Sequence, residues 1–201
     1  MSKNSEGVSK KEEILNAAII LFAEQGFSNT SITEVAKATN ASTANIFYHF
    51  KTKEELFLAA LQNVKEGIIS HFDEYFKDRE FENGLQMMEE IIAYYLYIAG
   101  AMEQWFLLLH SHYPYRLALV NEVCREHLEK TYNSLVEIFE KAVVKGKEDG
   151  SIADVDSRKT ALVIFSMIEG VVRFKIYNLY DSGVLFAELI KSCNKILKYK
   201  E

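Results

Sequence analysis

Three consecutive residues with short side chains, Thr43, Ala44 and Asn45, have the clearest chemical potential in this sequence. An asparagine amide can pair bidentately with adenine, a threonine can hydrogen-bond to a base or touch a thymine methyl group, and an alanine fits against that methyl group. Short side chains also let a helix approach the base edges closely. This run therefore predicts a surface that reads base pairs in the major groove of duplex DNA.

Hydroxyl and basic side chains surround this run and are predicted to contact the DNA backbone. Lys53 is expected in the first turn of a helix, where a cation is unfavourable against the helix dipole, and this hints at a nearby phosphate. His49 taken alone is typical of an ordinary surface or core histidine, whereas Ile46 and Phe50 are expected to pack in the core. The predicted phosphate contacts are Ser31, Thr33, Ser42, Tyr48, His49 and Lys53.

Capping motifs indicate the helices that position these side chains. The pattern Ser/Thr-x-x-Glu at residues 9–12, 31–34 and 52–55 predicts three helix starts. Gly26 is expected to end the first helix in a left-handed cap. Residues 40–42 indicate a turn, because asparagine tolerates a positive φ better than most residues.

A short helix over residues 43–50, with Ser42 as its cap, would follow that turn. Two short helices bury little by themselves, so the first and fourth helices must pack against them. Ala36 is small where the two short helices would cross. The arrangement suits a helix-turn-helix that presents its second helix to the major groove.

Residues 26–56 resemble the TetR/AcrR family of bacterial transcriptional regulators. The resemblance rests on matches at fixed spacing: Gly26-Phe27, Thr30-Ser31, Val35-Ala36, Ile46-Phe47-Tyr48-His49-Phe50 and Lys53-Glu54-Glu55-Leu56. It implies that Thr43, Ala44, Asn45 and Phe47 read bases and that Ser42, Tyr48, His49 and Lys53 contact phosphates. It also implies a repressor with a helical C-terminal domain that holds a ligand cavity and a dimer interface.

The composition indicates an all-α fold, since the 201 residues include one proline and nine glycines and are rich in helix formers. We expect a three-helix DNA-binding domain over residues 1–51 and a helical ligand-binding and dimerisation domain over residues 52–201. The net charge of −6 gives no support to DNA binding, because phosphates attract cations. The remaining helices are expected at residues 52–77, 85–109, 115–121, 122–146, 157–179 and 184–200.

Aromatic residues in the second domain are interrupted by a few polar ones, as in a binding pocket. An acidic group among aromatic rings would suit a cationic or hydrogen-bonding ligand. Plain core packing and a structural Glu169–Arg173 pair are the alternatives. The candidate ligand-binding residues are Tyr95, Glu103, Trp105, Phe106, His110, Phe165, Glu169 and Arg173.

The last two helices are expected to form a homodimer. Residues 160–172 are apolar almost all round, which indicates burial on more than one side. One helix-turn-helix reads few bases, whereas a twofold pair places two reading helices about 34–36 Å apart on a palindromic operator. A small-molecule effector, largely apolar or aromatic, would then release the DNA by favouring a mis-spaced dimer.

Other classes of protein fit the sequence less well. Residues 91–109 are too short and too interrupted for a membrane span, and the lone Cys124 and Cys193 are typical of a reducing cytoplasm. The pairs His110/His112 and Cys124/His127 are weak metal signals, and no phosphate-binding loop, catalytic set or cofactor motif is present. A helical DNA-binding or interaction protein without an effector remains the alternative.

Overall fold

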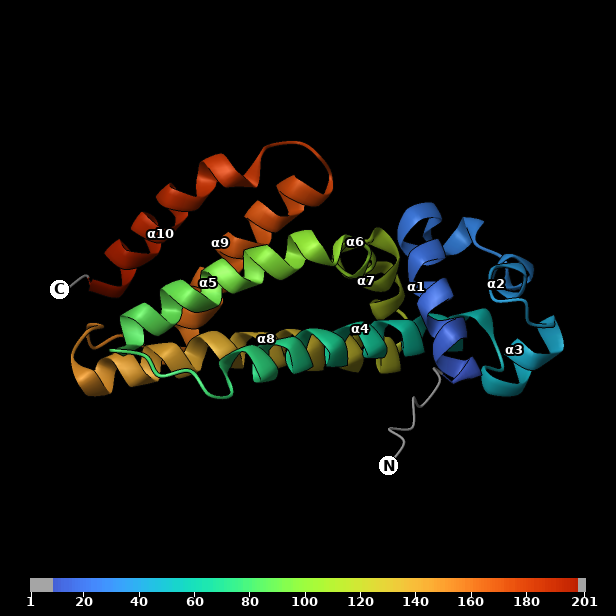
Figure 1. Ribbon diagram of the computed structural model, residues 1–201, viewed down its shortest axis with the longest axis horizontal. Coiled ribbons are helices and arrows are strands. Elements are labelled where there is room, and N and C mark those ends of the chain that lie inside the picture. The colour runs from blue at the N-terminus through green and yellow to red at the C-terminus, as the bar shows by residue number, and fades with distance from the viewer. Residues whose placement is uncertain (1–8, 199–201) are drawn as a thin grey trace, which may run out of the picture. The chain divides into compact units, whose positions relative to one another are not determined.

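The computed structural model describes residues 9–198, apart from the side chain of Ser182, and in this range every regular element is an α-helix. The all-α prediction is therefore confirmed. The helices are α1 (Lys10–Asn29), α2 (Ile32–Ala38), α3 (Thr43–His49), α4 (Lys53–Phe76), α5 (Gly84–Ala101), α6 (Glu103–His110), α7 (His112–Ala118), α8 (Glu122–Asp149), α9 (Ser157–Ile176) and α10 (Ser182–Lys198) (Figure 1). The predicted end of the last helix, at residue 200, lies outside the described residues.

The chain forms two compact units. Unit 1 comprises Met1–Glu66 and Leu107–Leu128, and unit 2 comprises Gly67–Phe106 and Glu129–Glu201. The helices α4, α6 and α8 each contribute residues to both units. The predicted reading residues all belong to unit 1, and most of the predicted ligand residues belong to unit 2.

Capping explains where the first three helices of unit 1 begin and end. Ser9 and Ser31 form two of the three predicted reciprocal capping boxes, and Ser42 caps α3 by accepting a bond from the Asn45 backbone N–H. At the third, the Thr52 hydroxyl accepts from the Glu55 N–H as predicted, but the Glu55 carboxylate accepts from the Lys51 N–H instead of the Thr52 N–H. Asn40 has the predicted positive φ, of 49°. The Ala41 N–H bonds to the Ala36 carbonyl at 2.9 Å, which gives α2 the paired closing bonds of a Schellman motif.

Gly26 differs from its predicted role as a left-handed cap. Its φ of 78° is positive, but its ψ of 162° is extended, a combination open essentially only to glycine. The helix resumes after this kink and ends at Asn29. Thr30 fixes the kink, because its backbone N–H and its hydroxyl both donate to the Gly26 carbonyl.

The predicted helix over residues 85–109 is wrong, because the structure breaks it at Met102 into α5 and α6. Met102 leaves the helical region with φ −121° and ψ 51°. The predicted break at Pro114 is also displaced. Pro114 lies in the first turn of α7, where a missing N–H costs nothing, and the interruption precedes it at Ser111.

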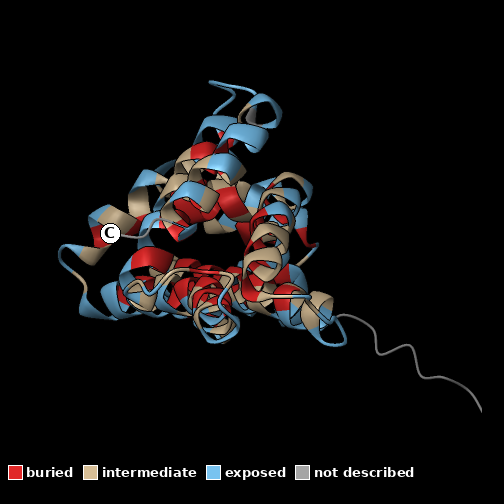
Figure 2. Cartoon of the chain, turned by 90° about the vertical axis from the view of Figure 1, so that its left-hand side faces the viewer, coloured by how far each residue is buried: buried red, intermediate tan, exposed pale blue. Residues whose placement is uncertain are grey.

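The core of unit 2 is rich in aromatic rings. Tyr95 of α5 is fully buried, and its ring lies between 5.5 and 6.0 Å from those of Phe106, Phe139 and Phe165. Figure 2 shows the buried residues on the faces that the helices turn toward one another. Near its N-terminal end α5 crosses α8 so closely that a Cβ on Gly84 would lie 2.0 Å from the Gly146 nitrogen.

Within the described residues, no single helix has the length and apolar character of a membrane span. A sharply bent combination of α5 with the following α6–α7 segment satisfies those two criteria only when taken together.

Candidate nucleic-acid interface

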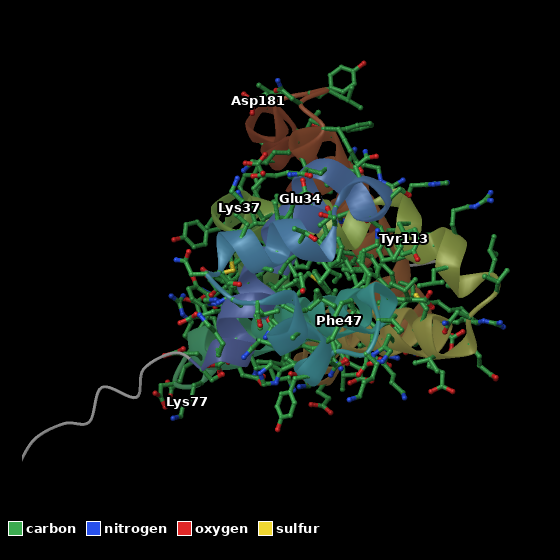
Figure 3. The ribbon with its side chains drawn as sticks, turned by 90° about the vertical axis from the view of Figure 1, so that its right-hand side faces the viewer. Glu34, Lys37, Phe47, Lys77, Tyr113 and Asp181 are labelled. Atoms are coloured by element: carbon green, nitrogen blue, oxygen red, sulfur yellow. The ribbon has the colours of Figure 1, made fainter. Side chains whose placement is uncertain are left out.

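The short helix α3 presents the predicted reading residues to solvent. Thr43, Ala44 and Asn45 are exposed in its first turn, whereas Ile46 is fully buried and Phe50, which follows the helix, is 3% exposed. Burial of Ile46 and Phe50 holds α3 against the rest of unit 1, so the opposite face of the helix stays exposed to solvent. Figure 3 looks onto α2 and α3, with Lys37 and Phe47 labelled.

Two serines predicted to contact phosphate differ in the hydrogen bonds that their hydroxyl groups make within the protein. The Ser31 hydroxyl donates to the Glu34 carboxylate at 2.7 Å, and the Ser31 backbone N–H donates to the same oxygen. These bonds lower the pKa of the Glu34 carboxyl and occupy the hydroxyl proton of Ser31. The Ser42 hydroxyl instead accepts a bond from the Asn45 N–H, so its proton remains available for a phosphate oxygen.

Lys53 has partners within the protein that the sequence did not reveal. Its ammonium donates to the backbone carbonyls of Phe27 at 2.8 Å and Thr30 at 3.0 Å, and it lies 4.2 Å from the centre of the Phe27 ring. These contacts explain a cation at the start of α4 without a phosphate. An ammonium has three protons, so one further bond from Lys53 can still be directed outward.

The aromatic residues at the end of α3 are more exposed than core packing would give. Tyr48 is 77% exposed and Phe47 is 44% exposed. The His49 ring lies edge-on to the Tyr48 ring with centroids 5.1 Å apart. Thr33 is exposed on α2, so hydroxyl, imidazole and ring groups are all presented on the same pair of short helices.

The structure adds Lys37 to the candidate phosphate contacts. Lys37 is exposed near the end of α2, and within the described part of the chain its ammonium takes part in no ion pair or hydrogen bond. Lys10, in contrast, donates to the Thr39 carbonyl at 2.9 Å and fastens α1 to the end of α2. The position of Lys37 one turn after the second capping box was the sequence signal that could have found it.

The predicted ligand residues lie in different surroundings. Tyr95 and Phe165 are buried together, and the Tyr95 hydroxyl donates to the Glu169 carboxylate at 2.5 Å. Burial raises the pKa of Glu169 to about 7, against the opposing effects of the Tyr95 hydrogen bond and of Arg173. An acid that ionises near neutral pH among aromatic rings is a candidate for contact with a cation.

The other predicted ligand residues are more dispersed. Glu103 and Arg173 are exposed, whereas Trp105 is half-buried with its ring against the backbone of Gly67. Phe106 is buried beside Tyr95. His110 is buried in unit 1. Among the described residues, no group of three or more His, Cys, Asp or Glu side chains is arranged to hold a metal ion.

Comparison with known proteins shows similarity to bacterial regulators. Residues 14–60 match the family described as bacterial regulatory proteins, tetR family. The chain is 26% identical to the HTH-type transcriptional regulator QacR of Staphylococcus aureus over 82% of this chain and 85% of QacR. It is also 26% identical to the icaADBC negative transcriptional regulator IcaR of Staphylococcus epidermidis, over 61% of this chain and 69% of IcaR.

A solved structure supports the same fold over nearly the whole chain. The crystal structure of a transcriptional regulator from Saccharomonospora viridis in complex with choline superposes with a TM-score of 0.78 at 18% identity. The superposition covers 92% of this chain and 93% of that protein. The helical architecture beyond the first fifty residues is therefore shared as well.

Proposed function

Because the chain belongs to the TetR family of bacterial regulatory proteins, we propose that it is a repressor that binds a palindromic operator as a homodimer. The chain is a DNA-binding transcriptional regulator and not an enzyme. Residues 1–51 read the operator, and residues 52–201 bind an effector and form the dimer. IcaR, named as a negative regulator, supports repression as the direction of control.

The observation that carries the proposal is the exposed first turn of α3 above its buried anchors. Thr43, Ala44 and Asn45 face solvent, while Ile46 fixes the helix beneath them. Base contacts come from these three residues and Phe47, and backbone contacts come from the surrounding hydroxyls, His49 and Lys53. Hydrogen-bonded caps, rather than a large positive charge, orient this surface.

Selection of bound duplexes from a random DNA pool tests the proposal directly. The expected product is an inverted repeat whose half-sites are one helical turn apart, about 34–36 Å, or a multiple of that spacing. Enrichment of an unpaired half-site would argue against the dimeric operator. Failure to enrich any sequence at low salt would contradict DNA reading itself.

The role of Lys53 predicts a loss of affinity that does not depend on DNA sequence. Lys53→Ala should weaken binding to selected and random duplexes alike and reduce the slope of log affinity against log salt by about one. Fluorescence anisotropy at several salt concentrations measures both. Lys65→Ala, which removes the same charge from α4 three turns away, should leave the slope unchanged.

Asn45→Ala provides the complementary result for base reading. It should lower the discrimination at one base pair by about 1–3 kcal/mol while leaving the salt slope in place.

If Lys53→Ala instead changed base preference and left the salt slope intact, the assignment of Lys53 to a phosphate would be wrong. Its bonds to Phe27 and Thr30 would then be its whole role.

Exposed apolar side chains on α9 and α10 support the dimer. Val163 is 51% exposed and Phe174 is 38% exposed although both lie in an apolar helix whose other face is buried. They are eleven residues apart, close to three whole turns, so they share one face of α9. The exposed apolar residues on these two helices, and at the residue that follows α9, include Leu162, Val163, Phe174, Tyr177, Val184 and Phe186.

The effector is proposed to bind in unit 2, among the aromatic rings around Glu169. The buried ring cluster supplies apolar surface, and the Glu169 carboxylate supplies one charged contact. The related fold that binds choline supports a small cation as one class of ligand for such a domain. An aromatic ammonium ion combines both features, since aromatic faces attract cations.

The raised pKa of Glu169 predicts a pH dependence for such a ligand. Glu169 is protonated and neutral below its pKa of about 7 and ionised above it. The affinity for benzyltrimethylammonium should therefore rise by about tenfold between pH 6 and pH 8, as the ionised fraction rises. Quenching of Trp105, the single tryptophan, follows the titration.

Glu169→Gln should abolish this pH dependence and leave operator affinity unchanged. Glu137→Gln, a change of the same type at an exposed site on α8, should behave as the unaltered protein does. An affinity that is the same at pH 6 and pH 8, or that rises equally in the Glu169 variant, would remove Glu169 from the ligand site.

A further inference from the structure

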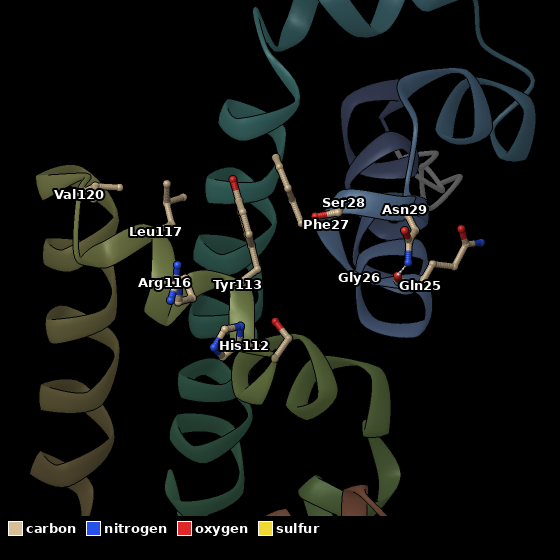
Figure 4. Close-up of a pocket in the computed structure, with 11 residues that line it drawn as sticks. Gln25, Gly26, Phe27, Ser28, Asn29, His112, Tyr113, Arg116, Leu117 and Val120 are labelled. Carbon is tan, nitrogen blue, oxygen red and sulfur yellow. Dashed lines mark hydrogen bonds between the residues drawn. The ribbon is translucent and has the colours of Figure 1, made fainter.

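Unit 1 has a hollow of about 680 Å³ away from the reading face of α3. It lies between the end of α1 and α7, and eleven residues line it (Figure 4). This volume is in the range of small-molecule sites, about 300–1,000 Å³. None of the predicted ligand residues lines it, and all of its lining residues belong to unit 1.

Two stacked aromatic rings form the centre of this hollow. The rings of Phe27 and Tyr113 are nearly parallel, at 6°, with centroids 3.8 Å apart. Figure 4 shows them side by side, with Arg116 and Leu117 on the side of Tyr113 and Ser28 and Asn29 beyond Phe27. Leu117 of α7 and Val120, which follows that helix, extend the apolar surface, and Val120 is 86% exposed.

The basic and acidic side chains that line the hollow are of one sign. Arg116 and His112 are the lining residues with basic side chains, and none of the lining residues is acidic. Within the part of the chain that the structure describes, the Arg116 guanidinium takes part in no ion pair or hydrogen bond. A guanidinium with free donors pairs bidentately with a carboxylate.

We infer that this hollow is a second ligand site, which binds a small aromatic carboxylate. The ring of the ligand packs against Phe27, Tyr113, Leu117 and Val120, and its carboxylate pairs with Arg116. The ligand is opposite in charge to the ammonium class proposed for Glu169, so the two sites are separable by probe. The inference depends on the hollow and its charge, and it holds whether or not Glu169 binds an effector.

Calorimetry of the full chain with 2-naphthoate tests the inference. The expected result is saturable binding with a submillimolar dissociation constant, and binding of the neutral analogue 2-naphthamide at least tenfold weaker. Arg116→Gln should weaken naphthoate binding at least tenfold, while Arg125→Gln, an exposed arginine on α8 outside the hollow, should not. Equal binding of the two probes, or no binding of either, overturns the inference.

Substitutions at Val120 avoid any question of folding, because this side chain is almost fully exposed. Val120→Asp should weaken naphthoate binding and Val120→Lys should strengthen it, whereas Val123→Asp, outside the lining, should have no effect. Operator affinity should stay the same in Arg116→Gln. A loss of affinity for DNA in that variant would assign Arg116 to a phosphate and overturn the inference, whereas a failure of the unaltered protein to bind DNA would affect only the proposed repressor.

Discussion

Gly84→Ala is expected to destabilise the chain by about 3 kcal/mol, the upper end of the range for overpacking in a core. The new methyl group would lie 2.0 Å from the Gly146 nitrogen and 2.6 Å from the Ala142 carbonyl oxygen. Both are backbone atoms of α8, so no side-chain rotation can relieve the contact. The start of α5 would have to move away from α8.

That movement would also break two bonds that fix the crossing. The Gly84 N–H donates to the Asp149 carboxylate at 2.7 Å, and the Leu85 N–H donates to the Ser151 hydroxyl at 3.1 Å. Thermal unfolding should show a decrease in Tm of about 6–12 °C. Ala93→Ser, which adds one atom at an exposed site on the same helix, should leave Tm nearly unchanged. An unaltered Tm for Gly84→Ala would show that the crossing is looser than the structure has it.

A double change on the exposed face of α9, Val163→Glu with Phe174→Glu, is expected to give a monomer that has lost most of its affinity for the operator. Carboxylates at these positions would be buried and would repel one another across a twofold interface. Separation of the two helix-turn-helix motifs of a dimer removes the gain from simultaneous binding, about 10²–10⁴-fold in affinity. Light scattering measures the mass, which should be near the chain mass of 23.1 kDa.

The control for this experiment is Val144→Glu, which places the same charge at another exposed apolar position of unit 2. It should remain dimeric and bind the operator normally. Circular dichroism checks that the double variant keeps its helices. A double variant that stays dimeric would show that the dimer interface lies on another surface. A monomer with full operator affinity would contradict the need for two helix-turn-helix motifs.

The two proposed ligand classes allow binding in unit 2 and binding in unit 1 to be measured separately. A cation that responds to Glu169 and an aromatic anion that responds to Arg116 would report on unit 2 and unit 1 respectively. Each ligand changes DNA affinity only to the extent that it binds differently to the free and operator-bound forms. Measurement of operator affinity with each probe therefore gives the coupling for each site independently.

The amino-acid sequence determined the local architecture of the helix-turn-helix and of the helix that precedes it. Capping boxes at Ser9 and Ser31, the positive φ of Asn40 and the buried Ile46 beneath an exposed Asn45 could all be predicted. Each depends on hydrogen bonds or periodicity within a few residues, and such interactions are encoded in the neighbouring sequence. The family resemblance covered this same local segment.

Only the tertiary structure decided the features that join distant segments. Lys53 bonds to Phe27, 26 residues earlier, so its position at the start of α4 has a cause that no local pattern contains. Tyr95 bonds to Glu169 across 74 residues, and the Gly84 backbone needs Gly146 opposite it. Similarly, the break at Met102 lies within an apolar stretch that reads as one continuous helix.

The same distinction applies to the helix-turn-helix. Its helices, turn and exposed residues follow from local bonding, so the sequence alone determined that the chain exposes Thr43 to Asn45 in the first turn of α3. The sequence did not determine what surrounds the helix-turn-helix. The stacking of Phe27 on Tyr113 and the hollow beside Arg116 form only when α7 packs beside the end of α1. Such contacts depend on how the whole chain buries its apolar faces, and that balance is set by the fold.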